Sequence, residues 1–339
     1  MKYGLLSVHV GEITNIGDYI QALASSQFMP QVNEYVNREK LDEYDNGPIK
    51  IIMNGWYMHD ANHWPPSPQI LPLFVAFHLN SSVKDIMLSE EGINYLKLHE
   101  PIGCRDYNTV ELLKNKGINA YFSGCMTLTL GAKFKNNIHN NKCYIVDPYI
   151  PIKNTFMTYL KDFICCLCNY GLVSKIRHSL FPGKEGWRTY TRSARFLRLY
   201  SKIISKRALG GAEYMTQESP YYGEGMPKDR QRLMEAERLV RIYSQAGLVI
   251  TSRIHCALPC LGLETPVLYT MDDNAEEISK CRFKGLAELF NSIHLDNEKI
   301  YTDFPIHSKI DVINDIHNKD TWRPLAEDLR KKCYDFVNE

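Results

Sequence analysis

Residues 247–255 read Gly-Leu-Val-Ile-Thr-Ser-Arg-Ile-His, and this stretch indicates the fold. Its first four residues form a short apolar run with β-branched side chains, which is typical of a buried strand. Thr251 and Ser252 are good helix N-cap residues, and apolar spacing continues through 256–261, so a helix is predicted to follow at once. Arg253 and His255 therefore lie at a strand-to-helix corner, where α/β sheets bind their ligands.

The side chains at this corner suit an anionic ligand that also has to be protonated. A helix N-terminus offers N–H groups and a positive dipole, Arg253 adds a cationic fork, and His255 exchanges a proton near neutral pH. The alternative is structural: an arginine paired with a surface carboxylate and a histidine packed on a helix end. The spacing alone leaves both interpretations open.

Strand-like and helix-like segments alternate through both halves of the chain. The strands are expected near 3–10, 32–36, 50–53, 73–79, 101–104, 120–122, 143–148, 213–216, 247–250 and 266–269. The clearest helices are expected near 15–28, 91–98, 106–116, 229–246 and 322–336. This alternation predicts an α/β protein with two doubly wound parallel sheets.

The composition is that of an ordinary globular protein: 339 residues, 44% hydrophobic and 23% charged. The ten cysteines form no regular framework. The N-terminus does not resemble a signal peptide, and no stretch approaches the roughly 20 apolar residues that cross a bilayer. We therefore expect a cytoplasmic protein with free thiols.

The segment 152–210 is unusually basic. It holds twelve Lys and Arg residues against two carboxylates, in a chain whose net charge is only +1. The cations alternate with apolar residues, namely Phe156, Leu160, Phe163, Ile164, Leu167, Phe196, Leu197, Leu199, Ile203 and Ile204. This pattern predicts helices that dock on the anionic inner face of the cell membrane. The alternative is a helical insert packed on its own domain; no nucleic-acid-binding motif accompanies the segment.

Two further corners carry polar side chains. In Asn15-Ile16-Gly17-Asp18, Gly17 allows a tight turn, and Asp18 could act as a base, accept a sugar hydroxyl or simply favour the helix start. In Gly103-Cys104-Arg105-Asp106, Arg105 could bind phosphate or carboxylate, or pair with Asp106. The loop 54–66 adds Trp56, His59 and His63, which could stack on or hydrogen-bond to a sugar. His59, Asp60 and His63 lack a fourth metal ligand, so no metal is predicted.

Several of these motifs resemble the polysaccharide pyruvyltransferases. They are 15–21, 102–106 with 123–130, and 251–255 with 265–267, and the resemblance spans about 3–130 and 213–269. It implies a GT-B-like fold in which two Rossmann-like domains face a central cleft. The expected domains are 1–137 on the acceptor side and 138–320 on the donor side, with the basic insert at about 152–210. The helix 321–339 is expected to cross back.

The resemblance also implies an activity. A pyruvyl group moves from phosphoenolpyruvate to two hydroxyls of one sugar, which gives a cyclic ketal and phosphate without a cofactor. The acceptor is expected to be a glycan linked to a lipid pyrophosphate. The family's Arg-x-His motif falls on Arg253 and His255. His255 is then the candidate acid, Arg253 and Arg105 the anion binders, and Asp18 a base or hydroxyl orienter.

Asn15, Gly17 and Ser252 complete the expected substrate contacts, beside the loop residues. Two other functions remain open from the sequence. A nucleotide-sugar glycosyltransferase of the same fold would need an acidic residue for the donor ribose, and Glu264 could serve. A non-catalytic glycan-binding subunit would turn over no donor.

Overall fold

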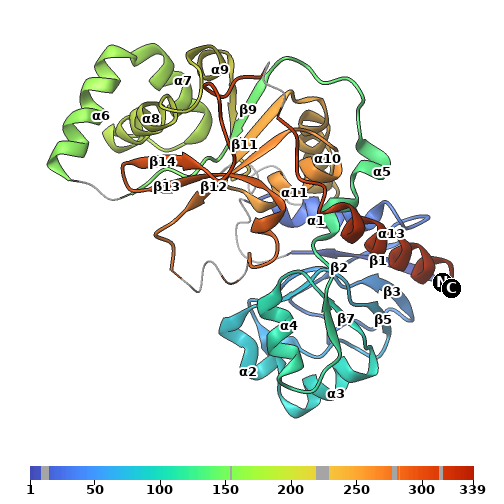
Figure 1. Ribbon diagram of the computed structural model, residues 1–339. Coiled ribbons are helices and arrows are strands. Elements are labelled where there is room, and N and C mark those ends of the chain that lie inside the picture. The colour runs from blue at the N-terminus through green and yellow to red at the C-terminus, as the bar shows by residue number, and fades with distance from the viewer. Residues whose placement is uncertain (9–14, 153–154, 219–228, 277–280, 282, 313–315) are drawn as a thin grey trace.

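The first half of the chain has two sections, each of which is a four-stranded parallel sheet (Figure 1). The computed structural model describes residues 1–8, 15–152, 155–218, 229–276, 281, 283–312 and 316–339. One section has the order β2 (Glu34–Asn37), β1 (Lys2–Ser7), β3 (Ile49–Ile52) and β5 (Ile70–Leu73). The other has the order β4 (Gly55–Tyr57), β6 (Phe77–Leu79), β7 (Ile102–Cys104) and β8 (Ala120–Phe122). All neighbouring strands in both sections are parallel.

The two sections are joined because β3 runs on into β4 and β5 runs on into β6. The prediction of one strand over 73–79 was therefore wrong in its centre. Ala76 has a left-handed φ of 52°, which interrupts the extended backbone. Its N–H donates to the Ser123 hydroxyl, and the Gly103 N–H donates to the Phe74 carbonyl. The break thus keeps its backbone hydrogen bonds satisfied within the protein.

The second half forms one sheet with the order β10, β9, β11, β12, β13, β14. These strands are β9 (Cys143–Val146), β10 (Glu213–Met215), β11 (Leu248–Thr251), β12 (Val267–Asp272), β13 (Asn291–Asp296) and β14 (Lys299–Thr302). Only the β13–β14 pair is antiparallel. β9, β11 and β12 lie side by side, as expected for the buried centre of an α/β sheet.

A hydrophobic core shared by both halves holds them together. It contains buried residues of α1 (Gly17–Ser26), α10 (Asp229–Gln245), α11 (Ile254–Gly262) and α13 (Arg323–Asn338). α13 lies along the first half, where the Tyr3 hydroxyl donates to the Val337 carbonyl (3.0 Å) and Lys50 Nζ to the Phe336 carbonyl (2.7 Å). The mixed α/β class with parallel sheets is confirmed, and the GT-B-like arrangement stays a prediction.

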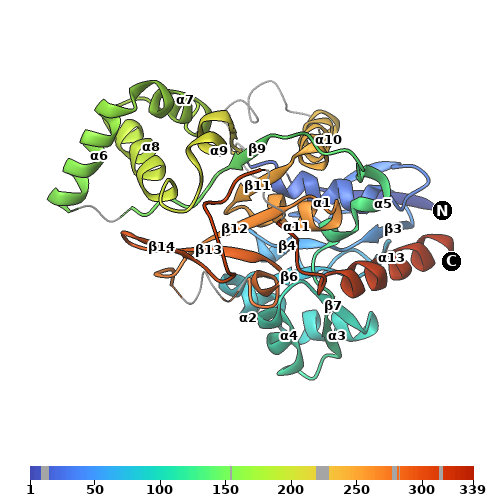
Figure 2. The same ribbon diagram turned by 45° about the horizontal axis from the view of Figure 1, so that its top comes forward.

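Shorter helices belong to the first half, and others form the basic insert. Those of the first half are α2 (Lys84–Met87), α3 (Glu90–Leu98) and α4 (Tyr107–Lys114), whereas α5 (Gly131–Phe134) packs against α10 and α11. Those of the insert are α6 (Phe156–Cys168), α7 (Tyr170–Leu180), α8 (Trp187–Tyr200) and α9 (Lys206–Gly211). Figure 2 shows α6, α7 and α8 at the end of the molecule away from both termini.

The membrane-docking prediction was wrong for the second group of apolar residues in the insert. The apolar residues at 196–204 do not face outward: Phe196, Leu197, Leu199, Ile203 and Ile204 are buried in the core of the second half. α8 also buries Arg195, whose Nε donates to Asp162 (2.8 Å). Arg198 on α8 pairs with both Asp162 (2.9 Å) and Glu298 (2.5 Å). These two cations therefore stabilise the insert, because they neutralise a fully buried carboxylate.

The apolar residues of α6 do face outward. Phe156 is 83% exposed and Leu167 63%, and Leu160, Phe163 and Ile164 lie beside them on the same helix. The aromatic side chains of Tyr159, Tyr170 and Trp187 adjoin this face, and all three are exposed. In the parts of the chain that the structure describes, no helix is both long and apolar enough to cross a membrane.

Candidate active site

A cavity of about 300 Å³ lies where the predicted strand-to-helix corners meet. Eight of the residues expected from the sequence line it, namely Asn15, Asp18, Trp56, His59, Arg105, Ser252, Arg253 and His255. Gln217, Ile254 and Phe283 complete the lining. Its volume is at the lower end of the range for small-molecule sites. Corners from both halves of the chain thus converge on one pocket.

Backbone pairing joins the corner at 15–18 to the second half of the chain. The Ile16 N–H donates to the Gln217 carbonyl at 3.1 Å, and Asn15 forms a bridge with Glu218. These contacts bring the start of α1 against the segment that follows β10. Because the Gln217 side chain also contacts the His255 carbonyl, Asp18 and His255 line the same cavity although they are far apart in sequence.

Gly17 contacts the site through its backbone. A Cβ at this position would lie 3.0 Å from His255 Nδ1 and 3.1 Å from Asn15 Oδ1. Because glycine has no Cβ, α1 can approach the His255 ring and the Asn15 side chain closely. Both of these residues line the pocket. His63, by contrast, does not line the cavity: its Nδ1 lies 2.8 Å from Asp42. The structure does not bring His63 to the other candidate residues.

Arg253 is held by two carboxylates. Its Nε donates to Asp147 Oδ2 at 3.1 Å, and its Nη1 lies 2.8 Å from Glu218 Oε1. Burial opposes the charged form, but these two carboxylates outweigh it and raise the pKa of Arg253 above its usual value. Arg253 is therefore a fixed cation at the wall of the pocket.

Thr251 and Ser252 hold this corner in a way that the sequence did not indicate. α11 begins at Ile254 with Arg253 at its N-cap, so neither hydroxyl residue is the cap. The Thr251 hydroxyl instead accepts from the Arg253 N–H at 2.9 Å. The Ser252 hydroxyl donates to the Asp147 carbonyl at 2.6 Å. These bonds fix the turn from β11 into α11.

Asp18 belongs to a partly buried network of charged and amide groups. Arg38 Nη1 and Gln21 Nε2 both lie 3.3 Å from Asp18 Oδ1, and Arg105 Nη1 donates to Gln21 Oε1 at 3.4 Å. Burial raises the pKa of the Asp18 carboxyl, but the charge of Arg38, followed by that of His255, outweighs it and lowers the pKa below its usual value. Asp18 therefore remains a carboxylate at neutral pH.

The dependence on Arg38 predicts a change in pH profile. Replacing Arg38 with methionine removes the cation that favours ionised Asp18, so the pKa of Asp18 rises and its carboxylate is lost at a higher pH. If activity needs the carboxylate, the acidic limb of the kcat/KM profile moves up by roughly one pH unit or more. Arg38→Lys, which keeps the charge, should move it less. An unchanged limb in the methionine variant would contradict this role for Asp18.

His255 occupies the first turn of α11 with a distorted backbone (φ −85°, ψ 16°). Gln217 Nε2 donates to the His255 carbonyl at 3.2 Å and to the Tyr243 hydroxyl at 3.0 Å. This bridging amide, which is almost fully buried, ties the histidine to α10. The His255 side chain can therefore meet a ligand from a fixed position, beside the negative charge of Asp18.

Arg38, Asp147, Gln217 and Phe283 were missed from the sequence. The first three follow β2, β9 and β10, where the carboxyl ends of parallel strands gather, so their positions carried a usable signal. No pattern in the sequence indicated Phe283. Among the described residues no cluster of three or more His, Cys, Asp or Glu side chains could hold a metal ion.

A charged pocket at the strand ends of parallel sheets defines this chain as a ligand-binding α/β protein. The family model described as polysaccharide pyruvyl transferase matches residues 15–274, and the chain belongs to this family. The match includes every site residue that was predicted from the sequence, and the family is one of transferases.

Comparison with solved structures gives a weaker likeness. An uncharacterized protein from Klebsiella pneumoniae subsp. pneumoniae superposes with a TM-score of 0.43 at 11% sequence identity. The match covers 83% of this chain and 87% of the other. No curated protein sequence matches the chain significantly.

Proposed function

We propose that the protein transfers the pyruvyl group of phosphoenolpyruvate to two hydroxyls of one sugar in a glycan, forming a cyclic ketal and releasing phosphate. The observation that carries this proposal is the meeting of Arg253, His255 and Asp18 in one cavity. The donor has two anionic groups and needs a proton on carbon. The pocket offers fixed cations, a histidine and an ionised carboxylate.

The reaction is an addition followed by a substitution at the same carbon. His255 gives a proton to the methylene carbon of phosphoenolpyruvate, and C2 becomes oxocarbenium-like. One sugar hydroxyl attacks C2, and its proton returns to the neutral His255 imidazole. The second hydroxyl then replaces the phosphate at C2 and closes the ketal, and its proton leaves with the phosphate. Arg253 and Arg105 bind the anionic groups of the donor throughout.

Asp18 fits the role of hydroxyl orienter better than that of strong base. Because Arg38 lowers the pKa of its carboxyl, Asp18 has little affinity for a proton at neutral pH. An ionised carboxylate still accepts a strong hydrogen bond from a sugar hydroxyl.

The glycosyltransferase alternative is less well supported. Glu264, the acidic residue available for a donor ribose, forms ion pairs with Lys135 (2.7 Å) and Arg323 (2.8 Å). It does not line the cavity that contains Arg253. A non-catalytic glycan-binding subunit would not need a histidine and an ionised carboxylate in the same pocket.

The test uses purified full-length protein with phosphoenolpyruvate and a panel of lipid-linked oligosaccharides, read by mass spectrometry and phosphate release. We expect phosphate only when donor and acceptor are both present, with a matching mass gain on the glycan, and we expect activity to persist in chelator. Turnover of a nucleotide sugar instead would overturn the donor. Activity lost in chelator and restored by a divalent ion would overturn the metal-free mechanism.

We further propose that the exposed face of α6 docks on the anionic inner face of the membrane, close to a lipid-pyrophosphate-linked acceptor. Aromatic and aliphatic side chains beside Lys and Arg suit the bilayer interface, and Lys161 and Arg188 are exposed near this face. Arg195 and Arg198 do not contribute, because their charges are paired inside the protein.

Vesicle sedimentation tests this docking. The protein should pellet with vesicles rich in phosphatidylglycerol, less so at high salt, and not with phosphatidylcholine alone. Replacing Phe156 and Ile164 with glutamate should abolish pelleting, since both side chains are exposed and the fold does not need them. Leu98→Glu is the matched control, because Leu98 is 80% exposed on α3 in the other half. Equal recovery of wild type in the supernatant with both lipids would refute docking.

A further inference from the structure

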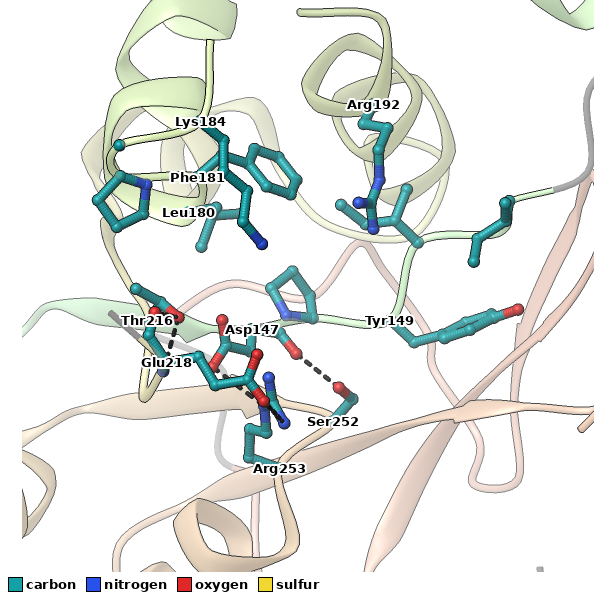
Figure 3. Close-up of a pocket in the computed structure, with 15 residues that line it drawn as sticks. Asp147, Tyr149, Leu180, Phe181, Lys184, Arg192, Thr216, Glu218, Ser252 and Arg253 are labelled. Carbon is teal, nitrogen blue, oxygen red and sulfur yellow. Dashed lines mark hydrogen bonds and ion pairs between the residues drawn. The ribbon is translucent and has the colours of Figure 1, made fainter. Parts of the chain in front are cut away.

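A second cavity, of about 510 Å³, lies on the other side of Arg253, between the sheet of the second half and the basic insert (Figure 3). Its floor includes Asp147, Thr216, Glu218, Ser252 and Arg253, at or just beyond the ends of β9, β10 and β11. Its roof includes Leu180, Phe181, Lys184 and Arg192 from the insert. Neither the sequence motifs nor the proposed reaction assigns this cavity a role.

Two cations of the roof point into the cavity. Figure 3 shows the Lys184 ammonium and the Arg192 guanidinium directed from the insert toward the floor. The Arg192 guanidinium carbon lies 4.9 Å from the centre of the Phe181 ring. Within the described part of the chain, neither cation forms an ion pair. They contrast with Arg195 and Arg198 of the same insert, whose charges are neutralised.

The surroundings of Arg192 favour an anion. Arg192 is exposed as a whole residue, but desolvation and then the nearby charge of Arg195 lower the pKa of its guanidinium. The floor carries two carboxylates, but Asp147 and Glu218 both contact Arg253. The positive charge left without a counter-ion is therefore on the roof.

The cavity adjoins the candidate active site. Ser252 and Arg253 line both cavities. Tyr149 adds an aromatic ring to the wall, and Ile150 and Ile152 add apolar surface. A ligand that extends from one cavity to the other would pass Arg253.

We propose that this cavity is an acceptor subsite, in which Lys184 and Arg192 bind the diphosphate of the glycan acceptor while its sugar reaches past Arg253 toward His255. Guanidinium and ammonium groups are the usual protein partners of phosphate oxygens, and two anionic centres match two cations on one wall. The acceptor assignment rests on the proposed function. The binding of a diphosphate does not.

The first experiment measures binding of inorganic pyrophosphate to the purified full-length protein by calorimetry, with geranyl diphosphate and UDP as separate titrants. Pyrophosphate and geranyl diphosphate should bind to wild type, and Lys184→Glu combined with Arg192→Glu should weaken both at least tenfold. Arg188→Glu combined with Lys206→Glu is the matched control: it makes the same charge change within the insert, at two exposed positions that do not line the cavity. Circular dichroism verifies folding, and the two glutamine substitutions replace the glutamates if folding fails.

Equal pyrophosphate binding by wild type and the double variant would overturn the subsite, whatever the enzyme's activity. Binding of UDP alone would overturn the acceptor assignment, since the cavity would then hold a nucleotide. In turnover assays the double variant should raise the acceptor KM at least tenfold and leave the phosphoenolpyruvate KM unchanged. Failure of the proposed function would instead appear as no turnover in wild type, with pyrophosphate binding intact.

Discussion

Replacing Arg253 with alanine is expected to lower kcat/KM by about 10²-fold or more, the scale of loss when a charge-stabilising group leaves a preorganised site. Arg253 is only partly exposed and is fixed by Asp147 and Glu218, so its guanidinium is already placed for an anion in the free protein. Its removal also leaves these two carboxylates without their partner, and they would then repel an anionic donor.

Lysine should restore little of this activity. Arg253 uses Nε for Asp147 and Nη1 for Glu218, and a single ammonium group cannot make both contacts while it also binds a ligand. Steady-state kinetics at fixed pH with varied phosphoenolpyruvate provide the measurement. Arg241→Ala is the control, because it removes an exposed arginine that pairs with Glu237 on α10. A loss of less than tenfold in the alanine variant would mean that the anion is bound elsewhere.

Replacing His255 with glutamine is expected to leave phosphoenolpyruvate bound but unreactive. The glutamine fills a similar volume and keeps the backbone contact with Gln217, so the fold should be retained. It cannot supply a proton to carbon, and general acid–base catalysis by one positioned group contributes roughly 10²–10⁴-fold. The expected result is therefore a fall in kcat of that size with little change in donor affinity.

Two measurements separate binding from chemistry. Calorimetry measures the affinity for phosphoenolpyruvate, and phosphate release at saturating donor measures kcat. His307→Gln is the control, because His307 is exposed and lies outside the cavity. A near-wild-type rate in His255→Gln would place the acid on another residue. Loss of donor binding with kcat retained would instead make His255 a binding residue.

Much of the candidate site could be predicted because its parts are local. The corners at 15–18, 103–106 and 251–255 each combine a strand end, a helix start and a polar side chain within a few residues. Parallel strands bring such corners to one edge of a sheet, so separate motifs could be assigned to one site. The match to the family model, over residues 15–274, includes all three corners.

The partners of those corners could not be assigned in the same way. Arg38 lies 3% exposed beside Asp18, and Asp147 contacts Arg253, yet each is remote in sequence from the residue whose charge it controls. Periodicity shows where a strand ends but not which side chains meet across strands. The sequence therefore predicted the ionisable groups without predicting which of them would remain charged.

The basic insert likewise has features that could be predicted from the sequence and features that could not. The sequence determined that 152–210 is basic and rich in amphipathic helix, because composition and spacing are local properties. It could not distinguish the apolar residues of α6 from those at 196–204, which have the same kind of pattern. Tertiary packing decided this: the apolar residues of 196–204 lie in the core of the second half, whereas the apolar face of α6 is left in contact with solvent. Burial is a property of contacts between distant segments, so only the folded chain could show which apolar face was free.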